Sequence, residues 1–458
     1  MNLFETITAI STPHGEGGIS IIRISGSRAI EIADSIFVSS KGKKLNTVKS
    51  HTIHHGHIKD KSGKTIDEVL VSVMKAPNTY TCEDIVEINC HGGIVSTKQI
   101  LLAVLDAGAV PASAGEFTKR AFLNGRIDLC EAESVIDIIN SKTNLSHEVS
   151  VNQLEGRLSQ KINGIREKIL ALTGHVQVLI DYPEEDLEPL TDEEFKNGLK
   201  DIIDDIKRLI ATADRGKLIK NGIQTAIVGK PNVGKSSLLN LLSGENRAIV
   251  TDIEGTTRDA IEQYINLGDV ELKIIDTAGI RETGDVIENM GVEKSKEYIK
   301  SSQLVIFMTD GKKGLDKNDE FIIENLKDKK TIVLVNKCED GCAVDVEYLK
   351  QKFENVILFS VHNEMGTDEL ADTVKNMFEM GDILNTNDAV ITNVRHSDAL
   401  LKAVTAMENA YNSVVAGIPT DMTFIDLENA ISALGEIVGL TVGEEIVDRI
   451  FHSFCIGK

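Results

Sequence analysis

The chain has 458 residues, more than one hydrophobic core usually holds, and this length predicts two to four domains. Its formal net charge of -22 argues against a protein that coats nucleic acid simply by releasing counterions. Residues 1–120 carry 13 Lys+Arg against 12 Asp+Glu, which leaves 36 against 59 of the chain's 49 and 71 for the remainder. Any contact with RNA should therefore use a local basic patch or the surface of a partner protein.

No run of about 18 apolar residues occurs, and the first residues lack a basic and then apolar leader. The six cysteines form no C-x-x-C pair, so neither a disulfide framework nor a zinc ribbon is indicated. We expect a soluble, cytoplasmic protein with reduced thiols and no membrane contact.

Residues 1–118 are typical of a compact α+β domain. Apolar alternation predicts strands at 19–24, 53–58, 69–74 and 84–90, and helical spacing predicts helices at 27–37 and 95–107. The period of two in 84–90 directs Glu87 and Asn89 to one face of the strand and Ile88 to the other.

Residues 119–215 follow a helical period. The apolar stripe from Val149 to Leu179 predicts one long helix that stops at Asp181-Tyr182-Pro183. A second helix should run to about Ala213, and 215–217 should mark the crossing into the next domain.

Residues 216–380 predict a domain with strands at 224–228, 271–275, 304–308, 331–335 and 356–360, separated by helical stretches. This order is typical of a mostly parallel, doubly wound sheet with its ligand at the carboxyl ends of the strands. The helical period returns in 381–458. We therefore expect 119–215 and 381–458 to form one discontinuous all-α domain into which the α/β domain is inserted.

The segment 229–236 dictates a ligand by its spacing. It matches G-x-x-x-x-G-K-[ST], in which backbone N–H groups surround a phosphate, Lys235 reaches the β and γ oxygens, and the Ser236 hydroxyl holds Mg²⁺. The start of the following helix adds its positive dipole end to the same place. A chance glycine-rich turn is the alternative.

Later segments are typical of a GTPase. Thr256 and Thr257 lie where a threonine pair joins the Mg²⁺ shell, and 276–279 (Asp-Thr-Ala-Gly) follows a strand as the second switch does. Asn336-Lys337-Cys338-Glu339 is similar to the guanine-reading loop N-K-x-D, and Ser360-Val361 to the last guanine-contacting loop. Glu339 replaces the usual aspartate, so it or Asp340 should pair with guanine.

Several motifs along the whole chain resemble the MnmE (TrmE) family of bacterial and mitochondrial tRNA-modification GTPases. They are 12–18 (TPHGEGG) with 23–26 (RISG), 91–93 (HGG), 115–117 (GEF), 120–124 (RAFLN), the phosphate loop and the terminal 454–458 (FCIGK). The resemblance implies a homodimer that binds tRNA and forms a heterotetramer with the FAD protein MnmG (GidA). Together they would add a carboxymethylaminomethyl or aminomethyl group at C5 of wobble uridine 34.

The resemblance also implies a Ras-like GTPase domain and an amino-terminal domain that binds 5-formyl- or methylene-tetrahydrofolate as one-carbon donor. The positions that match the folate contacts are Arg23, Glu87, Arg126 and Lys458. Cys455 is either a thiol that acts near the folate or a small residue that closes the last helix.

The expected GTPase chemistry departs from that of Ras, because Ile280 stands where Ras-like enzymes carry the water-orienting glutamine. The resemblance assigns that role to Glu288, and it assigns a K⁺ to Asn232, Thr251, Ile253 and Thr256. Separately from the resemblance, Arg258 and Arg281 as internal arginine fingers are a weaker alternative to the cation. Glu288, Lys235 and Cys455 are thus the candidate catalytic residues, and Ser236 and Thr257 the Mg²⁺ ligands. Together the motifs and the resemblance assign to GTP the residues Asn232, Val233, Gly234, Lys235, Ser236, Ser237, Thr251, Ile253, Thr256, Thr257, Asp276, Thr277, Ala278, Gly279, Asn336, Lys337, Glu339, Ser360 and Val361.

A regulatory GTPase of ribosome assembly shares the nucleotide loops, but that class typically adds a basic RNA-binding domain where this chain has an acidic, helical tail. A P-loop ATPase has no use for Asn336-Lys337.

Overall fold

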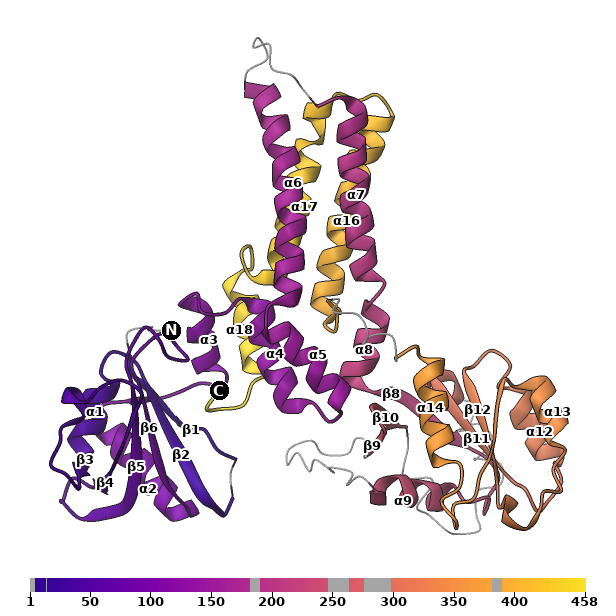
Figure 1. Cartoon of the computed structure of the whole chain (residues 1–458), viewed down its shortest axis with the longest axis horizontal. Helices are drawn as coiled ribbons and strands as arrows, with labels where there is room; N and C mark the ends of the chain where they lie inside the picture. The colour runs from indigo at the N-terminus through magenta and orange to yellow at the C-terminus, as the bar shows by residue number, and fades with distance from the viewer. Residues whose placement is uncertain (1–4, 14, 182–189, 246–262, 276–297, 381–388) are drawn as a thin grey trace. The chain divides into compact units, whose positions relative to one another are not determined.

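The computed structural model describes residues 5–13, 15–181, 190–245, 263–275, 298–380 and 389–458. The chain forms two compact units, coloured by residue number in Figure 1. Unit 1 comprises Met1–Ile136, Gln153–Arg166 and Ile431–Lys458, and unit 2 comprises Asp137–Asn152 and Glu167–Ala430. The domain boundaries expected at 118, 215 and 380 stay predictions.

Unit 1 is built on a seven-stranded sheet of order β3-β4-β5-β6-β2-β1-β7, antiparallel except for the pair β1–β7. Helices α1 (Ala29–Ile36) and α2 (Ile94–Asp106) contribute Ile32, Ile100 and Val104 to its apolar core. The strands are β1 (Ile7–Ile10), β2 (Gly17–Ser25), β3 (Phe37–Ser39), β4 (Thr52–Lys59), β5 (Thr65–Met74), β6 (Ile85–Gly92) and β7 (Val110–Pro111). The four predicted strands and both predicted helices are confirmed. β1, β3 and β7 were not predicted, because two to four residues are too few to show a period and only pairing with neighbours holds them extended.

A second core in unit 1 joins segments that lie more than 300 residues apart. Ala121 of α3 (Glu116–Leu123) and Leu129 at the start of α4 (Leu129–Asn140) share it with Val447 and Phe451 of α18 (Glu444–His452) and with Phe454. The carboxyl-terminal segment is thereby fixed beside α3 and α4 within unit 1.

The single long helix predicted from Val149 to Leu179 is wrong, because the structure divides it into α5 (Asn144–Leu154) and α6 (Arg157–Asp181). Gly156 adopts φ +81° at the break, and a Cβ there would lie 2.8 Å from Glu131 Oε1. A glycine accepts this left-handed conformation at little cost. Leu145 and Val149 of α5 belong to the core of the unit 2 sheet.

The helices of unit 2 include most of α6, with α7 (Asp192–Ile210), α8 (Ala213–Asn221), α16 (Val394–Val415) and the first turns of α17 (Phe424–Val438), and α7 packs along α16 (Figure 1). Thr191 and Glu194 form a capping box at the start of α7. Arg215–Lys217, expected to mark a domain crossing, lies inside α8, which continues to Asn221. Among the described residues no helix is both long enough and apolar enough to cross a bilayer.

The second sheet has six strands in the order β13-β12-β11-β8-β10-β9, and every pair is parallel except β10–β9. This confirms the mostly parallel α/β sheet and, with the first sheet and the helices, the multidomain α/β plus α fold class. β9 was not predicted. The elements are β8 (Ile223–Val228), α9 (Lys235–Glu245), β9 (Gln263–Leu267), β10 (Val270–Ile274), β11 (Leu304–Asp310), α12 (Lys317–Glu324), β12 (Thr331–Asn336), α13 (Val346–Lys352), β13 (Asn355–Leu358) and α14 (Thr367–Met377).

Candidate functional site

The phosphate-loop motif connects β8 to α9 at the carboxyl end of the parallel sheet. Its two glycines are required by geometry: a Cβ on Gly229 would lie 2.3 Å from the Met308 carbonyl oxygen, and one on Gly234 would lie 2.4 Å from Asn336 Nδ2. Both have positive φ, and Asn232 between them has φ +65°. The loop therefore has the tight course that directs backbone N–H groups inward around an anion.

Lys235 opens α9 with its side chain folded over this loop. Its Nζ donates to the carbonyl oxygens of Gly229 at 2.6 Å and Lys230 at 2.7 Å. Burial lowers the pKa of Lys235 to about 8. A phosphate group beside this amine would supply the negative charge that restores its affinity for the proton.

Asn336 ties the predicted guanine loop to the phosphate loop. This buried side chain donates from Nδ2 to the Val233 carbonyl at 2.8 Å and accepts from the Val361 N–H at 3.2 Å. Lys337 adds a second link, because its Nζ bonds Asn232 O at 3.1 Å and Asp310 Oδ2 at 2.7 Å. The structure thus brings together the residues predicted from three separate segments, at 232–236, 336–337 and 361.

Glu339 lies in the short 3₁₀ helix η2 (Cys338–Asp340), directly after this pair. Hydrogen bonds from its own backbone N–H and from Ser360 lower the pKa of the carboxyl group, and Lys312 Nζ lies 3.5 Å from Oε1. The carboxylate is thus ionised and held beside Ser360, where it is able to accept from a guanine edge.

The remaining predicted GTPase residues lie outside the described residues. They are Thr251, Ile253, Thr256, Thr257, Asp276, Thr277, Ala278, Gly279 and Glu288, together with the alternatives Arg258 and Arg281. Their roles stay predictions.

A second polar cluster forms in unit 1 around Arg23. Arg23 on β2 faces Glu87 on β6 in the strand register, and its Nε and Nη2 lie 2.9 and 2.8 Å from Glu87 Oε1. Arg23 Nη1 also donates to the Gly457 carbonyl at 3.3 Å, which Ser11 Oγ contacts at 3.0 Å. Burial and the nearby Arg23 lower the pKa of Lys458. The terminal residues of the chain are therefore part of this cluster.

Tyr80 belongs to the same cluster and was not predicted. The guanidinium carbons of Arg126 and Arg23 lie 4.8 and 5.8 Å from its ring centroid, and Arg126 Nη1 donates to the Tyr80 carbonyl at 3.3 Å. Its position in a loop of polar residues gave no periodic signal. The structure thus gathers all four predicted folate positions, while Cys455 is exposed and accepts from the Gly115 N–H at 3.3 Å through its backbone carbonyl.

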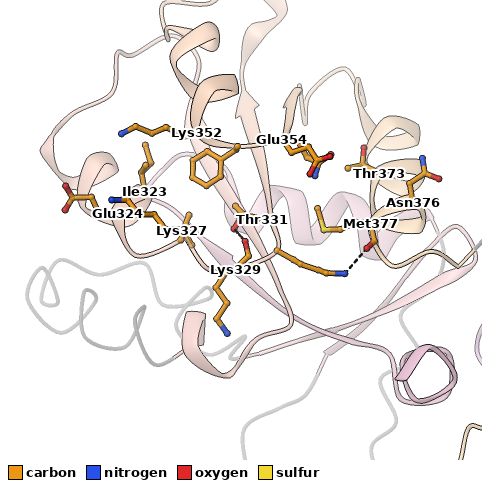
Figure 2. A pocket seen from close by; sticks show the side chains of 14 residues that line it. Ile323, Glu324, Lys327, Lys329, Thr331, Lys352, Glu354, Thr373, Asn376 and Met377 are labelled. Carbon is orange, nitrogen blue, oxygen red and sulfur yellow. Dashed lines mark hydrogen bonds between the residues drawn. The ribbon is translucent and has the colours of Figure 1, made fainter. Parts of the chain in front are cut away.

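A hollow of about 930 Å³ lies at the opposite, amino-terminal ends of β12 and β13 (Figure 2). Four lysines line it, and two of them bond backbone carbonyls of the fold: Lys329 Nζ donates to the Lys300 and Ser302 carbonyls, and Lys330 Nζ to the Met377 carbonyl at the end of α14. No predicted site residue lines this hollow.

Comparison with known proteins identifies the family of this chain. Residues 6–126 match the family model described as "GTP-binding protein TrmE N-terminus", and residues 129–455 match "MnmE helical domain". Curated proteins named "tRNA modification GTPase MnmE" are similar over 100% of this chain and 100% of their own length. They include those of Clostridioides difficile (strain 630) at 49% identity, and of Geobacillus kaustophilus (strain HTA426) and Thermoanaerobacter pseudethanolicus (strain ATCC 33223 / 39E), both at 48%. With full-length identity at this level, the chain belongs to the MnmE family of tRNA modification GTPases.

Proposed function

We propose that this GTPase binds GTP and Mg²⁺ in the loops of unit 2 and uses its hydrolysis in the modification of C5 of the wobble uridine of certain tRNAs. The observation that carries the nucleotide assignment is the pair of hydrogen bonds that Asn336 makes, donating to the Val233 carbonyl and accepting from the Val361 N–H. This side chain makes the guanine loop and the phosphate loop one rigid receptor, so the base and the phosphates are fixed together.

We further propose that a K⁺ supplies the positive charge that an arginine finger supplies elsewhere, and that Glu288 orients the attacking water. Two facts support this proposal. Ile280 has no group that could form a hydrogen bond to the attacking water, and Asn232 lies in the phosphate loop with a left-handed backbone conformation of φ +65°. Thr251, Ile253 and Thr256 would complete the K⁺ site and Thr257 would join Ser236 at Mg²⁺. When bound, the cations neutralise charge on the phosphates; Lys235 binds and orients the β and γ oxygens.

The cluster around Arg23 is proposed to bind a tetrahydrofolate that donates the one-carbon unit. Both contacts of Arg23 with Glu87 use Oε1, which leaves the second carboxylate oxygen for the paired donors of a pterin edge. Tyr80 offers a ring face, and Arg126 and Lys458 offer cations for the carboxylates of the folate glutamate. These residue types fit the group they are proposed to hold.

The proposed assembly is a homodimer that acts in the cytoplasm with the FAD protein MnmG in a heterotetramer and binds tRNA there. The acidity of the chain outside residues 1–120 supports a division of labour in which the partner supplies much of the tRNA-binding surface.

The decisive experiment is mass spectrometry of tRNA nucleosides from cells with and without the gene. Loss of C5-aminomethyl-type uridines at the wobble position, restored by the wild-type gene, is the expected result. Unchanged nucleosides would overturn the assignment to tRNA modification and move the ribosome-assembly alternative forward.

A further inference from the structure

The motif 120–124 (RAFLN) is part of the family resemblance but has no role in the proposed function. Arg120 lies on α3, and Asn124 is the C-cap of this helix. Residues 75–84 connect β5 to β6 without a helix or strand of their own, and we call them the Tyr80 loop. Side chains of α3 and its C-cap bind this loop at three points, which are the Tyr80 hydroxyl, the Glu83 carboxylate and the Thr81 carbonyl.

The first point fixes the tip of the Tyr80 ring. The Tyr80 hydroxyl lies 2.9 Å from Thr118 Oγ1, and Thr118 is fully buried on α3. The ring itself is half-buried, and the guanidinium carbon of Arg126 lies 4.8 Å from its centroid. A tyrosine ring turns about its side-chain torsions, and a hydrogen bond at its far end restricts that rotation. The direction of this ring within the Arg23 cluster therefore depends on Thr118.

The second point is a buried ionic cluster at the Glu83 carboxylate. Arg120 is only 1% exposed, and its Nη1 donates to both carboxylate oxygens of Glu83, at 3.0 and 3.2 Å. Its Nη2 donates to Glu116 Oε1 at 3.0 Å. Ser25 Oγ of β2 donates to Glu83 Oε2 at 2.7 Å. Because a charge in such a place is costly once its partner is removed, the Glu83 carboxylate is held where Arg120 lies.

The third point is the backbone next to Tyr80. Asn124 Nδ2 donates to the Thr81 carbonyl at 2.6 Å, directly after Tyr80 in the chain. Thr79, directly before Tyr80, donates from Oγ1 to the Glu83 carbonyl at 2.6 Å. Both backbone neighbours of Tyr80 are thus tied to α3, one through Asn124 and the other through Glu83.

We propose that Thr118 and Arg120 are positioning residues of the folate site. Thr118 fixes the tip of the Tyr80 ring, and Arg120 acts through Glu83 to fix the loop that carries the ring. The inference rests on the proposed function, in which Tyr80 offers a ring face to a tetrahydrofolate. A ring that is already in place binds the flat part of such a ligand without first losing torsional freedom, so the affinity is higher.

The test for Thr118 is a double-mutant cycle on the full-length protein, with affinity for 5-formyltetrahydrofolate measured by calorimetric titration. Thr118→Val keeps the size of its side chain and removes the hydroxyl, and Tyr80→Phe keeps the ring and removes its hydroxyl. Each single variant should bind about three- to tenfold more weakly, the equivalent of one hydrogen bond. The double variant should bind no more weakly than the weaker single variant, because both changes remove the same bond.

Losses that multiply in the double variant, or wild-type affinity in Thr118→Val, would overturn the role of Thr118. Thr97→Val, at a buried position of α2, is the matched control and should bind as the wild type does. If the wild type itself binds no 5-formyltetrahydrofolate, the proposed folate function fails and this inference with it. A wild type that binds, beside a Thr118→Val variant that binds equally well, removes the inference alone.

Arg120→Lys tests the second role, because an ammonium group keeps the charge but lacks the planar fork that reaches both carboxylates. Folate affinity should fall by up to about tenfold, as in Tyr80→Ala. Adding Tyr80→Ala to Arg120→Lys should then cost little more, because the contribution of the ring is already lost. If Tyr80→Ala costs as much in Arg120→Lys as in the wild type, Arg120 does not act through Tyr80.

A thermal melt shows whether Arg120→Lys is folded. If it is not, Glu83→Gln gives the same test at the more exposed end of the ion pair, since it replaces one of the oxygens that Arg120 binds by an N–H donor. Its loss of folate affinity should likewise not add to that of Tyr80→Ala. Additive losses in this pair would overturn the role of Arg120.

Discussion

The phosphate loop of unit 2 and the Arg23 cluster of unit 1 are encoded in different ways. The first is one segment of eight residues, 229–236, whose backbone forms the receptor. Its two glycines are required because a Cβ at either position would lie 2.3–2.4 Å from a neighbouring atom. The second is made of side chains from 23, 80, 87 and 126 and of the last two residues of the chain. A local site of backbone amides is recognisable by spacing, whereas a site of distant side chains depends on the whole domain. The two should therefore fail independently.

The largest expected effect is on the local site. Gly234→Ala places a Cβ against Asn336 Nδ2 and forces alanine to φ +111°, so strain and overpacking of together about 4 kcal/mol should weaken guanine nucleotide binding by roughly 10³. Titration with a fluorescent nucleotide measures it. Gly244→Ala on the exposed face of α9 has nothing within 4 Å of the new Cβ and should bind normally. Equal nucleotide affinities for both variants would contradict the conclusion that the phosphate loop has no room for a Cβ at position 234.

Replacing K⁺ by Na⁺ tests whether GTP hydrolysis needs a K⁺ in addition to the residues of the phosphate loop. Because no glutamine follows 276–279, GTP turnover should fall by about 10² or more, as when an arginine finger is removed. The measurement is phosphate release at constant ionic strength. Similar rates in both salts would remove the cation from the proposal and turn attention to Arg258 and Arg281.

Glu288→Ala should cut GTP hydrolysis by about 10² while nucleotide affinity stays unchanged, as for a residue used only in the transition state. Glu282→Ala, in the same segment, is the matched control. Single-turnover hydrolysis and equilibrium binding separate the two effects. Wild-type hydrolysis in Glu288→Ala would reassign the water to another group.

Arg23→Ala tests the Arg23 cluster of unit 1, and the result can be compared with that for the phosphate loop. It removes the charged contacts with Glu87 and Gly457, so affinity for 5-formyltetrahydrofolate should fall by about 10 to 100-fold. GTP turnover should not change. Arg28→Ala at the N-cap of α1, where the ion pair with Glu31 is exposed, should retain folate affinity. Calorimetric titration measures it, and a thermal melt shows whether the domain is still folded; a folded Arg23→Ala with wild-type folate affinity would contradict the assignment.

The smallest expected effect concerns pH. In the free protein Lys235 has a pKa of about 8, lower than that of an ordinary lysine, and the phosphates of a nucleotide favour its ammonium form. Nucleotide binding above pH 8 must therefore be accompanied by proton uptake. Affinity should be flat from pH 6.5 to 7.5 and fall by at most about tenfold per pH unit above 8. Calorimetry in two buffers of different ionisation enthalpy measures the protons, and no uptake at pH 9 would contradict the lowered pKa.

Much of the fold was predictable because it is written in short-range patterns. Five of the six strands of the second sheet follow from apolar runs, and the phosphate loop follows from glycine spacing. These local patterns fix the course of the backbone whatever packs outside it. The same reasoning failed at Glu155-Gly156, where an unbroken apolar stripe hid the break between α5 and α6.

Only the tertiary structure decided which distant side chains meet. Arg23, Glu87 and the terminal Gly457-Lys458 come together because strand register and the core around Phe451 bring them together, and no periodicity in the sequence records either. Tyr80 beside Arg126 was invisible for the same reason. The sequence by itself determined the nucleotide loop, because its chemistry resides in consecutive backbone amides. A site made of side chains is determined only once long-range packing has fixed where each of them lies.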